Sequence, residues 1–252
     1  MRYISLFSGI GGVDLGLDRA GMKCVAQVEQ NKFALKVLNK HWPDVPKFED
    51  VREYDPEPGE CEVVAGGFPC QDISNAANNR QGLGGERSGL WWEMLRIIER
   101  AKPAFVFIEN VSQLRRMGLG IVLRELSEIG YNAEWETIRA AQIGLPHKRS
   151  RLFIVAYANS IDRFAGGDNE SRFSVADRPE WVTQAAQCKS GWELQRWLVE
   201  TYAALDFSPS NPGTYRGIDG IPNRVDRLRG CGNAVVPQIA ELIGRRIMEL
   251  GQ

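Results

Sequence analysis

An apolar run that ends in two glycines, a proline and a cysteine constrains this chain more than any other feature. Val63-Val64-Ala65 reads as a buried strand, and Gly66-Gly67-Phe68-Pro69-Cys70-Gln71 follows it. A second buried strand, residues 104–108, is followed directly by Glu109-Asn110. In an open α/β sheet, functional groups gather at the carboxyl ends of strands. The sequence therefore predicts that a thiol, Cys70, and a carboxylate, Glu109, face one ligand.

Length and composition limit the class of protein. The 252 residues, 43% of them hydrophobic, suffice for one large domain or for a large and a small one. A net charge of −1 gives no sign of a polyanionic partner, so any nucleic-acid surface must be local. Five scattered cysteines and two histidines argue against a metal site and favour free thiols in a reducing cytoplasm. The absence of a signal peptide or a membrane-length apolar run predicts a soluble, cytoplasmic protein.

The first 30 residues follow the pattern of a nucleoside-binding unit. Residues 3–7 predict a strand, Ser8-Gly9-Ile10-Gly11-Gly12 a turn, and residues 13–20 a helix, while a second strand, 23–28, ends at Glu29. The glycines allow the backbone to approach a ligand closely, and an acid about 20 residues later can accept both hydroxyls of a ribose. Taken alone, this pattern equally fits an ordinary structural turn or an NAD site.

Asp14 argues against NAD. It occupies the position of the third glycine of a dinucleotide fingerprint, where we expect its carboxylate to meet the pyrophosphate near a helix start. A ligand with adenosine but no phosphate, such as S-adenosylmethionine, avoids this conflict. Asp50, after a third strand near Lys47-Phe48, could accept from the exocyclic amine of adenine or be an ordinary loop residue.

The rest of the chain completes an α/β pattern. Arg149 and Arg151 alternate onto one side of a predicted strand, residues 152–156, where two guanidiniums can hold a carboxylate or a phosphate. Residues 157–222 are rich in loop signals and too poor in apolar residues to fold alone. We further predict a long loop at 72–87, helices at 90–98 and 119–129, a strand at 131–137 and a closing helix after Pro237.

Assembled in order, these motifs resemble the cytosine carbon-5 DNA methyltransferases of bacteria and phages. The resemblance covers residues 1–156 and 223–252. It is carried by Phe7-Ser8-Gly9-Ile10-Gly11-Gly12, Glu29, Asp50, Pro69-Cys70-Gln71, Glu109-Asn110-Val111, Arg149-Ser150-Arg151 and Gly232-Asn233-Ala234-Val235-Val236-Pro237. It implies an α/β, Rossmann-like methyltransferase sheet with helices on both faces, formed by these two segments. It also implies a small irregular target-recognition insert at 157–222.

The resemblance implies a role for each matching residue. Cys70 would add to carbon 6 of the cytosine, Glu109 would hold or protonate the ring nitrogen, and Arg151, supported by Arg149, would orient Glu109. Gln71 and Asn110 belong to the same catalytic motifs. The implied cofactor is S-adenosylmethionine, which leaves as S-adenosylhomocysteine. Its implied contacts are Phe7, Ser8, Gly9, Gly11, Gly12, Glu29, Gln30, Asp50, Val51, Pro69, Leu90, Asn233 and Ala234. Gln30 stands where the family often has an aromatic residue.

The implied substrate is double-stranded DNA from which one cytosine is flipped out. The 72–87 loop would close over the flipped base, with Ser74, Arg87, Arg224 and Arg227 as contacts to the DNA backbone. A partner restriction endonuclease fits this reading. Three alternatives stay open: an RNA-directed (transfer RNA) enzyme of the same chemistry, an inactive DNA-binding relative, and an NAD-dependent oxidoreductase.

Overall fold

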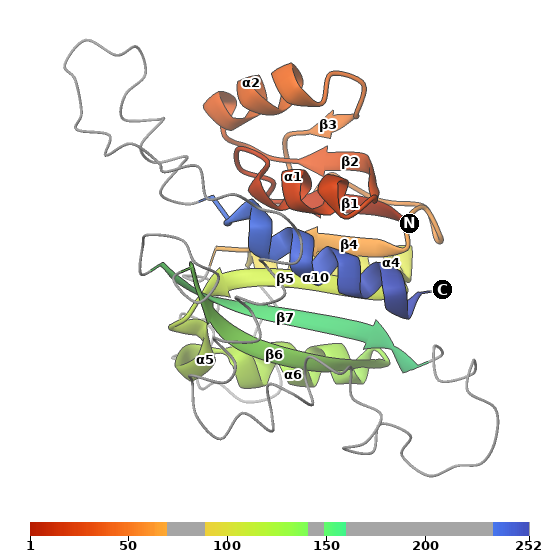
Figure 1. The fold of residues 1–252 in the computed structure, drawn as a ribbon. Helices are drawn as coiled ribbons and strands as arrows, with labels where there is room; N and C mark the ends of the chain where they lie inside the picture. Colours follow the sequence, from red (N-terminus) through yellow and green to blue (C-terminus); the bar gives the residue numbers. More distant parts are fainter. Residues whose placement is uncertain (70–88, 141–148, 160–233, 252) are drawn as a thin grey trace. The chain divides into compact units, whose positions relative to one another are not determined.

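The computed structural model describes residues 1–69, 89–140, 149–159 and 234–251 (Figure 1). The chain divides into two compact units. The first comprises Met1–Thr137, Arg151–Asn159 and Asp219–Gln252, and the second comprises Ile138–Ser150 and Ser160–Ile218. Only 138–140 and 149–150 of the second unit fall within the described residues, so the architecture below is that of the first.

Among the described residues, seven strands form one mixed sheet in the order β3-β2-β1-β4-β5-β7-β6. The pairings β3–β2, β2–β1, β1–β4 and β4–β5 are parallel, and β5–β7 is antiparallel. The strands are β1 (Arg2–Leu6), β2 (Lys23–Val28), β3 (Lys47–Phe48), β4 (Val63–Gly66), β5 (Phe105–Val111), β6 (Tyr131–Arg139) and β7 (Ser150–Ala158). This order places β1 and β4 side by side, with Leu6 opposite Gly66, so the turn after β1 and the glycines at the end of β4 lie together.

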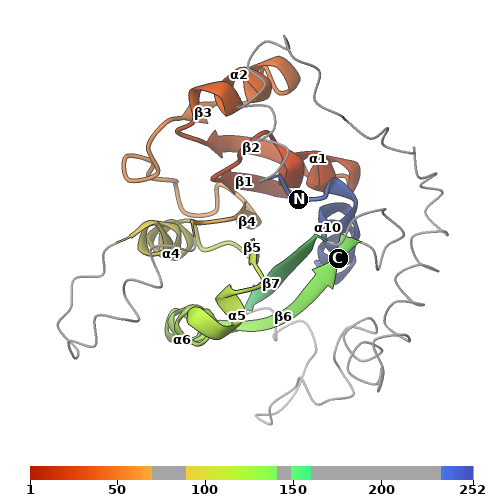
Figure 2. The ribbon, with the colours of Figure 1, turned by 90° about the vertical axis from the view of Figure 1, so that its left-hand side faces the viewer.

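Helices cover both faces of the sheet, as Figure 2 shows. Helices α1 and α10 lie on one face, and α4 and α6 lie on the other. Their bounds, with those of α2 and α5, are α1 (Gly12–Arg19), α2 (Lys32–His41), α4 (Leu90–Ala101), α5 (Leu114–Met117), α6 (Leu119–Glu128) and α10 (Pro237–Leu250). The α/β methyltransferase-like fold predicted from the sequence is therefore confirmed.

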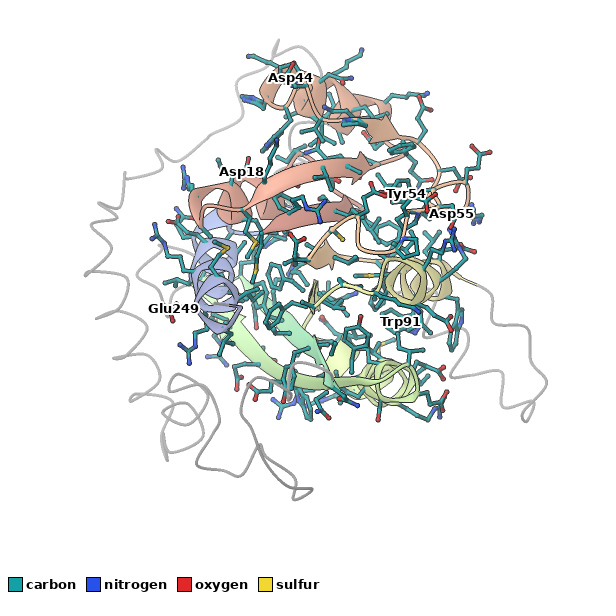
Figure 3. All side chains as sticks on the ribbon, turned by 90° about the vertical axis from the view of Figure 1, so that its right-hand side faces the viewer. Asp18, Asp44, Tyr54, Asp55, Trp91 and Glu249 are labelled. Atoms are coloured by element: carbon teal, nitrogen blue, oxygen red, sulfur yellow. The ribbon has the colours of Figure 1, made fainter. Side chains whose placement is uncertain are left out.

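The apolar core follows the alternation of the strands. In β1, Ile4 and Leu6 point to the α4 face and are fully buried. On that face Trp91 of α4, labelled in Figure 3, is 1% exposed, and its ring centroid lies 5.1 Å from that of Phe68. Burying such aromatic residues contributes much of the stability of a core. This packing fixes Phe68 just before the predicted site.

Small residues allow α10 to lie directly against α1. A Cβ added at Gly16 would come within 2.5 Å of the Ala240 Cβ, and one added at Gly12 within 2.6 Å of the Val235 carbonyl oxygen. A larger side chain at either glycine would push the helices apart. The residues before Pro237 and the start of α10 therefore lie in close backbone contact with the first strand–helix unit.

Two helices were not anticipated from the sequence. Helix α2 begins after Asn31, whose side-chain oxygen accepts from the backbone N–H groups of Phe33 and Ala34 at 3.0 Å, a typical N-cap. The short α5 follows β5. In addition, β5 extends to Val111, so Glu109 and Asn110 lie inside the strand rather than after its end.

Candidate active site

A pocket of about 270 Å³ opens at the carboxyl ends of the parallel strands. This volume is close to the lower end of the ~300–1,000 Å³ range typical of small-molecule sites. Its lining comes from the ends of β1, β2, β4 and β5, from the turn before α1 and from the residues before α10. The predicted residues in the lining are Phe7, Ser8, Gly9, Gly12, Glu29, Gln30, Asp50, Val51, Pro69, Leu90, Glu109 and Ala234.

The turn between β1 and α1 forms the floor of the pocket. Phe7 and Gly9 have positive φ angles of 55° and 56°, and no atom lies within 4 Å of the place where a Cβ on Gly9 would sit. The Glu29 carboxylate accepts from the backbone N–H of Gly9 and from that of Asn31, both at 2.7 Å. These two bonds fix the carboxylate at the pocket, where its remaining lone pairs can accept from hydroxyl groups.

The charges of the lining favour a cationic ligand over a phosphate. Among the described lining residues there are four carboxylates and one guanidinium, that of Arg52, while Lys32 and Arg151 pair with two of the carboxylates from outside the lining. With these partners counted, the site keeps a negative excess at Glu29, which is held by backbone N–H groups, and this excess disfavours a pyrophosphate and attracts a positive charge. The carboxylates are those of Glu29, Glu49, Asp50 and Glu109. The residues present thus suit an adenosine ligand with a sulfonium and an amino group, as expected for S-adenosylmethionine.

The expectation that Asp14 faces the pocket is wrong. Asp14 belongs to α1, and its fully buried carboxylate faces β1 and β2, where it accepts from Gln27 Nε2 at 2.7 Å and from Ser5 Oγ at 3.0 Å. Burial raises the pKa of Asp14 to about 6, although these two hydrogen bonds oppose the rise. The case against a phosphate ligand depends instead on the carboxylates of the lining.

Glu109 and Arg151 meet beside this pocket. The Glu109 Oε1 atom lies 2.8 Å from the Arg151 Nε atom, and the two side chains are 10% and 20% exposed. Gly67 of the β4 end packs against the same carboxylate, because a Cβ there would come within 3.0 Å of Glu109 Oε2. A nearly buried acid is thus held in one orientation at the edge of the cavity.

The Asn110 side chain ties β5 to the segment that leads to Cys70. Its Nδ2 donates to the Phe68 carbonyl at 2.8 Å, and its Oδ1 accepts from the Val111 backbone N–H at 2.9 Å. Asn110 is 4% exposed and does not line the pocket. This geometry gives Asn110 a positioning part rather than contact with a substrate.

The other residues predicted from the sequence either do not line the pocket or lie outside the described residues. Gly11 does not line the pocket; it precedes α1 with φ 83°, and a Cβ there would collide with the Trp42 ring. Arg149 precedes β7, and its carbonyl oxygen accepts from the Ala140 N–H at 2.8 Å. Outside the described residues lie Cys70, Gln71, Ser74, Arg87, Arg224, Arg227 and Asn233. Cys70 follows Pro69, a lining residue, directly in the sequence.

The pocket also contains residues that the sequence analysis missed. Phe33 and Ala34 come from α2, and a signal for them existed in the Asn31 cap that starts this helix. Ser5 and Val28 are buried strand residues, and nothing in the sequence distinguishes them from the neighbouring core positions. The remaining unpredicted residues are Leu6, Ile10, Val13, Asn31, Glu49, Arg52, Gly66, Gly67 and Val235.

Sheet order, pocket and acidic lining together define a Rossmann-like methyltransferase fold. The sequence model described as C-5 cytosine-specific DNA methylase matches residues 1–202, more than half of the chain. The chain therefore belongs to the C-5 cytosine-specific DNA methylase family.

Individual relatives agree with this assignment. Over 62% of the chain, it is 38% identical to the Type II methyltransferase M2.BsuMI of Bacillus subtilis and, again over 62%, 38% identical to M.CviJI of Paramecium bursaria Chlorella virus IL3A. The chain spans 42% of the length of each of these curated relatives. The solved structure of the S. pombe Dnmt2 methyltransferase matches over the full length of both chains with a TM-score of 0.61 at 17% identity, which supports the fold.

Among the described residues, no helix has both the length and the apolar character that crossing a bilayer requires.

Proposed function

We propose that this chain is a DNA (cytosine-5-)-methyltransferase that uses S-adenosylmethionine. The observation that carries the proposal is the Glu109–Arg151 ion pair at the rim of an acidic pocket, next to the residue that precedes Cys70. A carboxylate oriented in this way can contact a pyrimidine ring while the pocket holds the methyl donor.

Different residues of the pocket would contact different parts of the cofactor. Glu29 would accept the ribose hydroxyls, and Asp50 would accept from the adenine amine. The backbone of the 8–12 turn would approach the amino-acid portion. The pocket's net negative charge favours the positively charged donor and weakens retention of the neutral thioether product. When bound, S-adenosylmethionine supplies the methyl group.

The protein's own residues would activate the cytosine. The Cys70 thiolate adds to ring carbon 6, and the electron pair of the 5,6 double bond becomes available at carbon 5. Glu109 holds the ring nitrogen and the neighbouring amine, and it supplies a proton as negative charge develops there. After carbon 5 has taken the methyl group, loss of its proton to a base and expulsion of the thiolate restore the double bond, and the ring nitrogen returns its proton to Glu109. Arg151 keeps the Glu109 carboxylate in position throughout.

We assign duplex DNA as the substrate because the chain belongs to a DNA methylase family and its relatives are Type II methyltransferases. The target cytosine must leave the base stack, since carbon 6 is inaccessible to a thiolate within a duplex. Residues 157–222 would read a short sequence around it. A partner restriction endonuclease belongs to the same proposal.

The deciding experiment supplies tritiated S-adenosylmethionine with either duplex DNA or transfer RNA. We expect label in DNA, located at carbon 5 by bisulfite sequencing. Label in transfer RNA alone would overturn the DNA assignment. DNA that contains 5-fluorocytosine should trap a covalent adduct, and its absence would indicate an inactive DNA-binding relative. The matched variant Cys70→Ser should lose both methylation and the adduct while it still binds S-adenosylhomocysteine.

A further inference from the structure

The short helix α5 places two arginines near the catalytic carboxylate. β5 ends at Val111 and α5 begins at Leu114, so little chain separates them. Figure 1 shows α5 near the tip of β5, at the carboxyl end of the parallel strands. The lining residues place the pocket at this end of the sheet. Because Arg115 follows Glu109 by six residues, their Cα atoms are at most about 20 Å apart. A DNA duplex that reaches Glu109 therefore comes within about 20 Å of the Arg115 Cα atom.

Helix α5 is anchored on one side and exposed on the other. Leu114 is 1% exposed and belongs to the main hydrophobic core, and its carbonyl accepts from the Gly118 N–H at 3.0 Å. Arg115 and Arg116 are both exposed, and Met117 is 46% exposed. The anchor gives the two guanidiniums a defined position, so less entropy is lost when they bind a ligand than for arginines on an unanchored segment.

The sequence on either side of these arginines carries no acidic residue. Residues 110–124 contain three arginines and no aspartate or glutamate. The next acids, Glu125 and Glu128, form ion pairs with Arg124 at 2.8 and 3.7 Å. Within the part of the chain that the structure describes, Arg115 and Arg116 take part in no ion pair. Two neighbouring cations without an acidic partner attract a polyanion and gain little from intramolecular contacts.

We infer that Arg115 and Arg116 bind the phosphate backbone of the DNA duplex beside the extruded cytosine. The inference rests on the proposed function, since it requires a nucleic acid at the Glu109 end of the sheet. Guanidiniums hold phosphates through paired hydrogen bonds, and such contacts fix the register of the protein without reading sequence. Arg115 and Arg116 would therefore bind the DNA backbone in the same way whatever the recognition sequence.

The test compares two variants that each lose two exposed cations. R115A/R116A removes the proposed contacts. R19A/K23A removes Arg19 at the end of α1 and Lys23 at the start of β2, which are exposed and lie at the opposite, amino-terminal end of the parallel strands. Binding to a 30-base-pair duplex of mixed sequence is measured by fluorescence anisotropy with S-adenosylhomocysteine present, at several salt concentrations.

We expect R115A/R116A to bind the duplex roughly tenfold more weakly at low salt, with a salt dependence shallower by about 2 in log–log slope. R19A/K23A should keep the wild-type affinity and slope, and R115K/R116K should keep most of both. All variants should bind S-adenosylhomocysteine normally, which shows that they are folded.

Two results would overturn the inference while the proposed function stands. In the first, R115A/R116A binds the duplex with wild-type affinity and slope although the wild type methylates DNA. In the second, R19A/K23A loses as much affinity, which would mean a general electrostatic attraction. Failure of the wild type to bind or methylate DNA would refute the proposed function, and the inference with it.

Discussion

Glu109 and Arg151 form a diagonal ion pair across two antiparallel strands. In the β5–β7 ladder Glu109 lies opposite Phe153, and Arg151 lies opposite Val111, so the two side chains are offset by two residues on one face. The Oε1–Nε distance is 2.8 Å, and both side chains are largely shielded from water. Shielding strengthens the pair and leaves the carboxylate one preferred orientation. The strand pairing itself therefore positions the acid.

The first prediction tests whether Arg151 acts through Glu109. Glu109→Gln and Arg151→Ala should each lower the rate of methyl transfer by about 10²–10⁴. The double variant should be no slower than Glu109→Gln alone, because a positioning residue has nothing left to position. Single-turnover measurements at saturating cofactor and DNA give these rates. If the two losses multiply in the double variant, Arg151 has a separate role.

The second prediction concerns Gly67. A methyl group there would lie 3.0 Å from both Glu109 Oε2 and the Glu109 carbonyl oxygen, so the carboxylate must shift in Gly67→Ala. We expect a loss of at least about tenfold in kcat with unchanged binding of S-adenosylhomocysteine, since small misplacements of a catalytic group are costly. Gly120→Ala is the matched control because open space surrounds its Cβ position. Equal kcat values for the two variants would contradict the prediction.

The strand pattern of this chain was predictable, but the directions of several side chains were not. Runs of apolar residues gave β1, β2, β4 and β5, and their ends gave Glu29 and Glu109, because period and turn chemistry are local properties. Asp14 was misplaced because its direction depends on Gln27 and Ser5 from two neighbouring strands. Long-range partners of this kind leave no trace in local sequence.

The same distinction applies to the pocket. The turn glycines and Glu29 were found from spacing alone. Phe33 was missed because the Asn31 cap, which signals the start of α2, was not recognised, and α5 was missed because four residues are too few for a periodic signal. The ion pair itself was predicted from the resemblance, whereas its diagonal geometry follows only from the β5–β7 register.

The third prediction separates two acids that line the pocket. Glu29 is fixed by backbone N–H groups and faces the expected ribose, so Glu29→Ala should weaken S-adenosylhomocysteine binding by about 10–100-fold. Glu49 has a 62% exposed side chain that pairs with Lys32, and such surface pairs contribute ~0–1 kcal/mol. Glu49→Ala should therefore change the affinity by less than about fivefold. Isothermal titration calorimetry measures both, and a larger loss for Glu49→Ala would refute our assignment.

The buried Asp14 carboxyl gives the fold a specific dependence on pH. Its pKa is raised from 3.8 to about 6, chiefly by burial. The folded state therefore holds this proton more tightly than the unfolded state. Its contribution to the free energy of unfolding is greatest below pH 4, falls as the pH rises toward 6, and is constant above that. The full difference corresponds to about 3 kcal/mol.

The fourth prediction isolates this contribution with Asp14→Asn, a neutral side chain of the same shape that can still bond Gln27 and Ser5. Between pH 7.5 and pH 5 the wild type should gain about 1.4 kcal/mol of unfolding free energy relative to D14N. Urea unfolding at several pH values measures the two curves, and their difference cancels the titration of every other group. If the unfolding free energies of the wild type and D14N change with pH in parallel, Asp14 has the same pKa in the folded and unfolded states. Its burial between α1 and the sheet would then have no electrostatic cost.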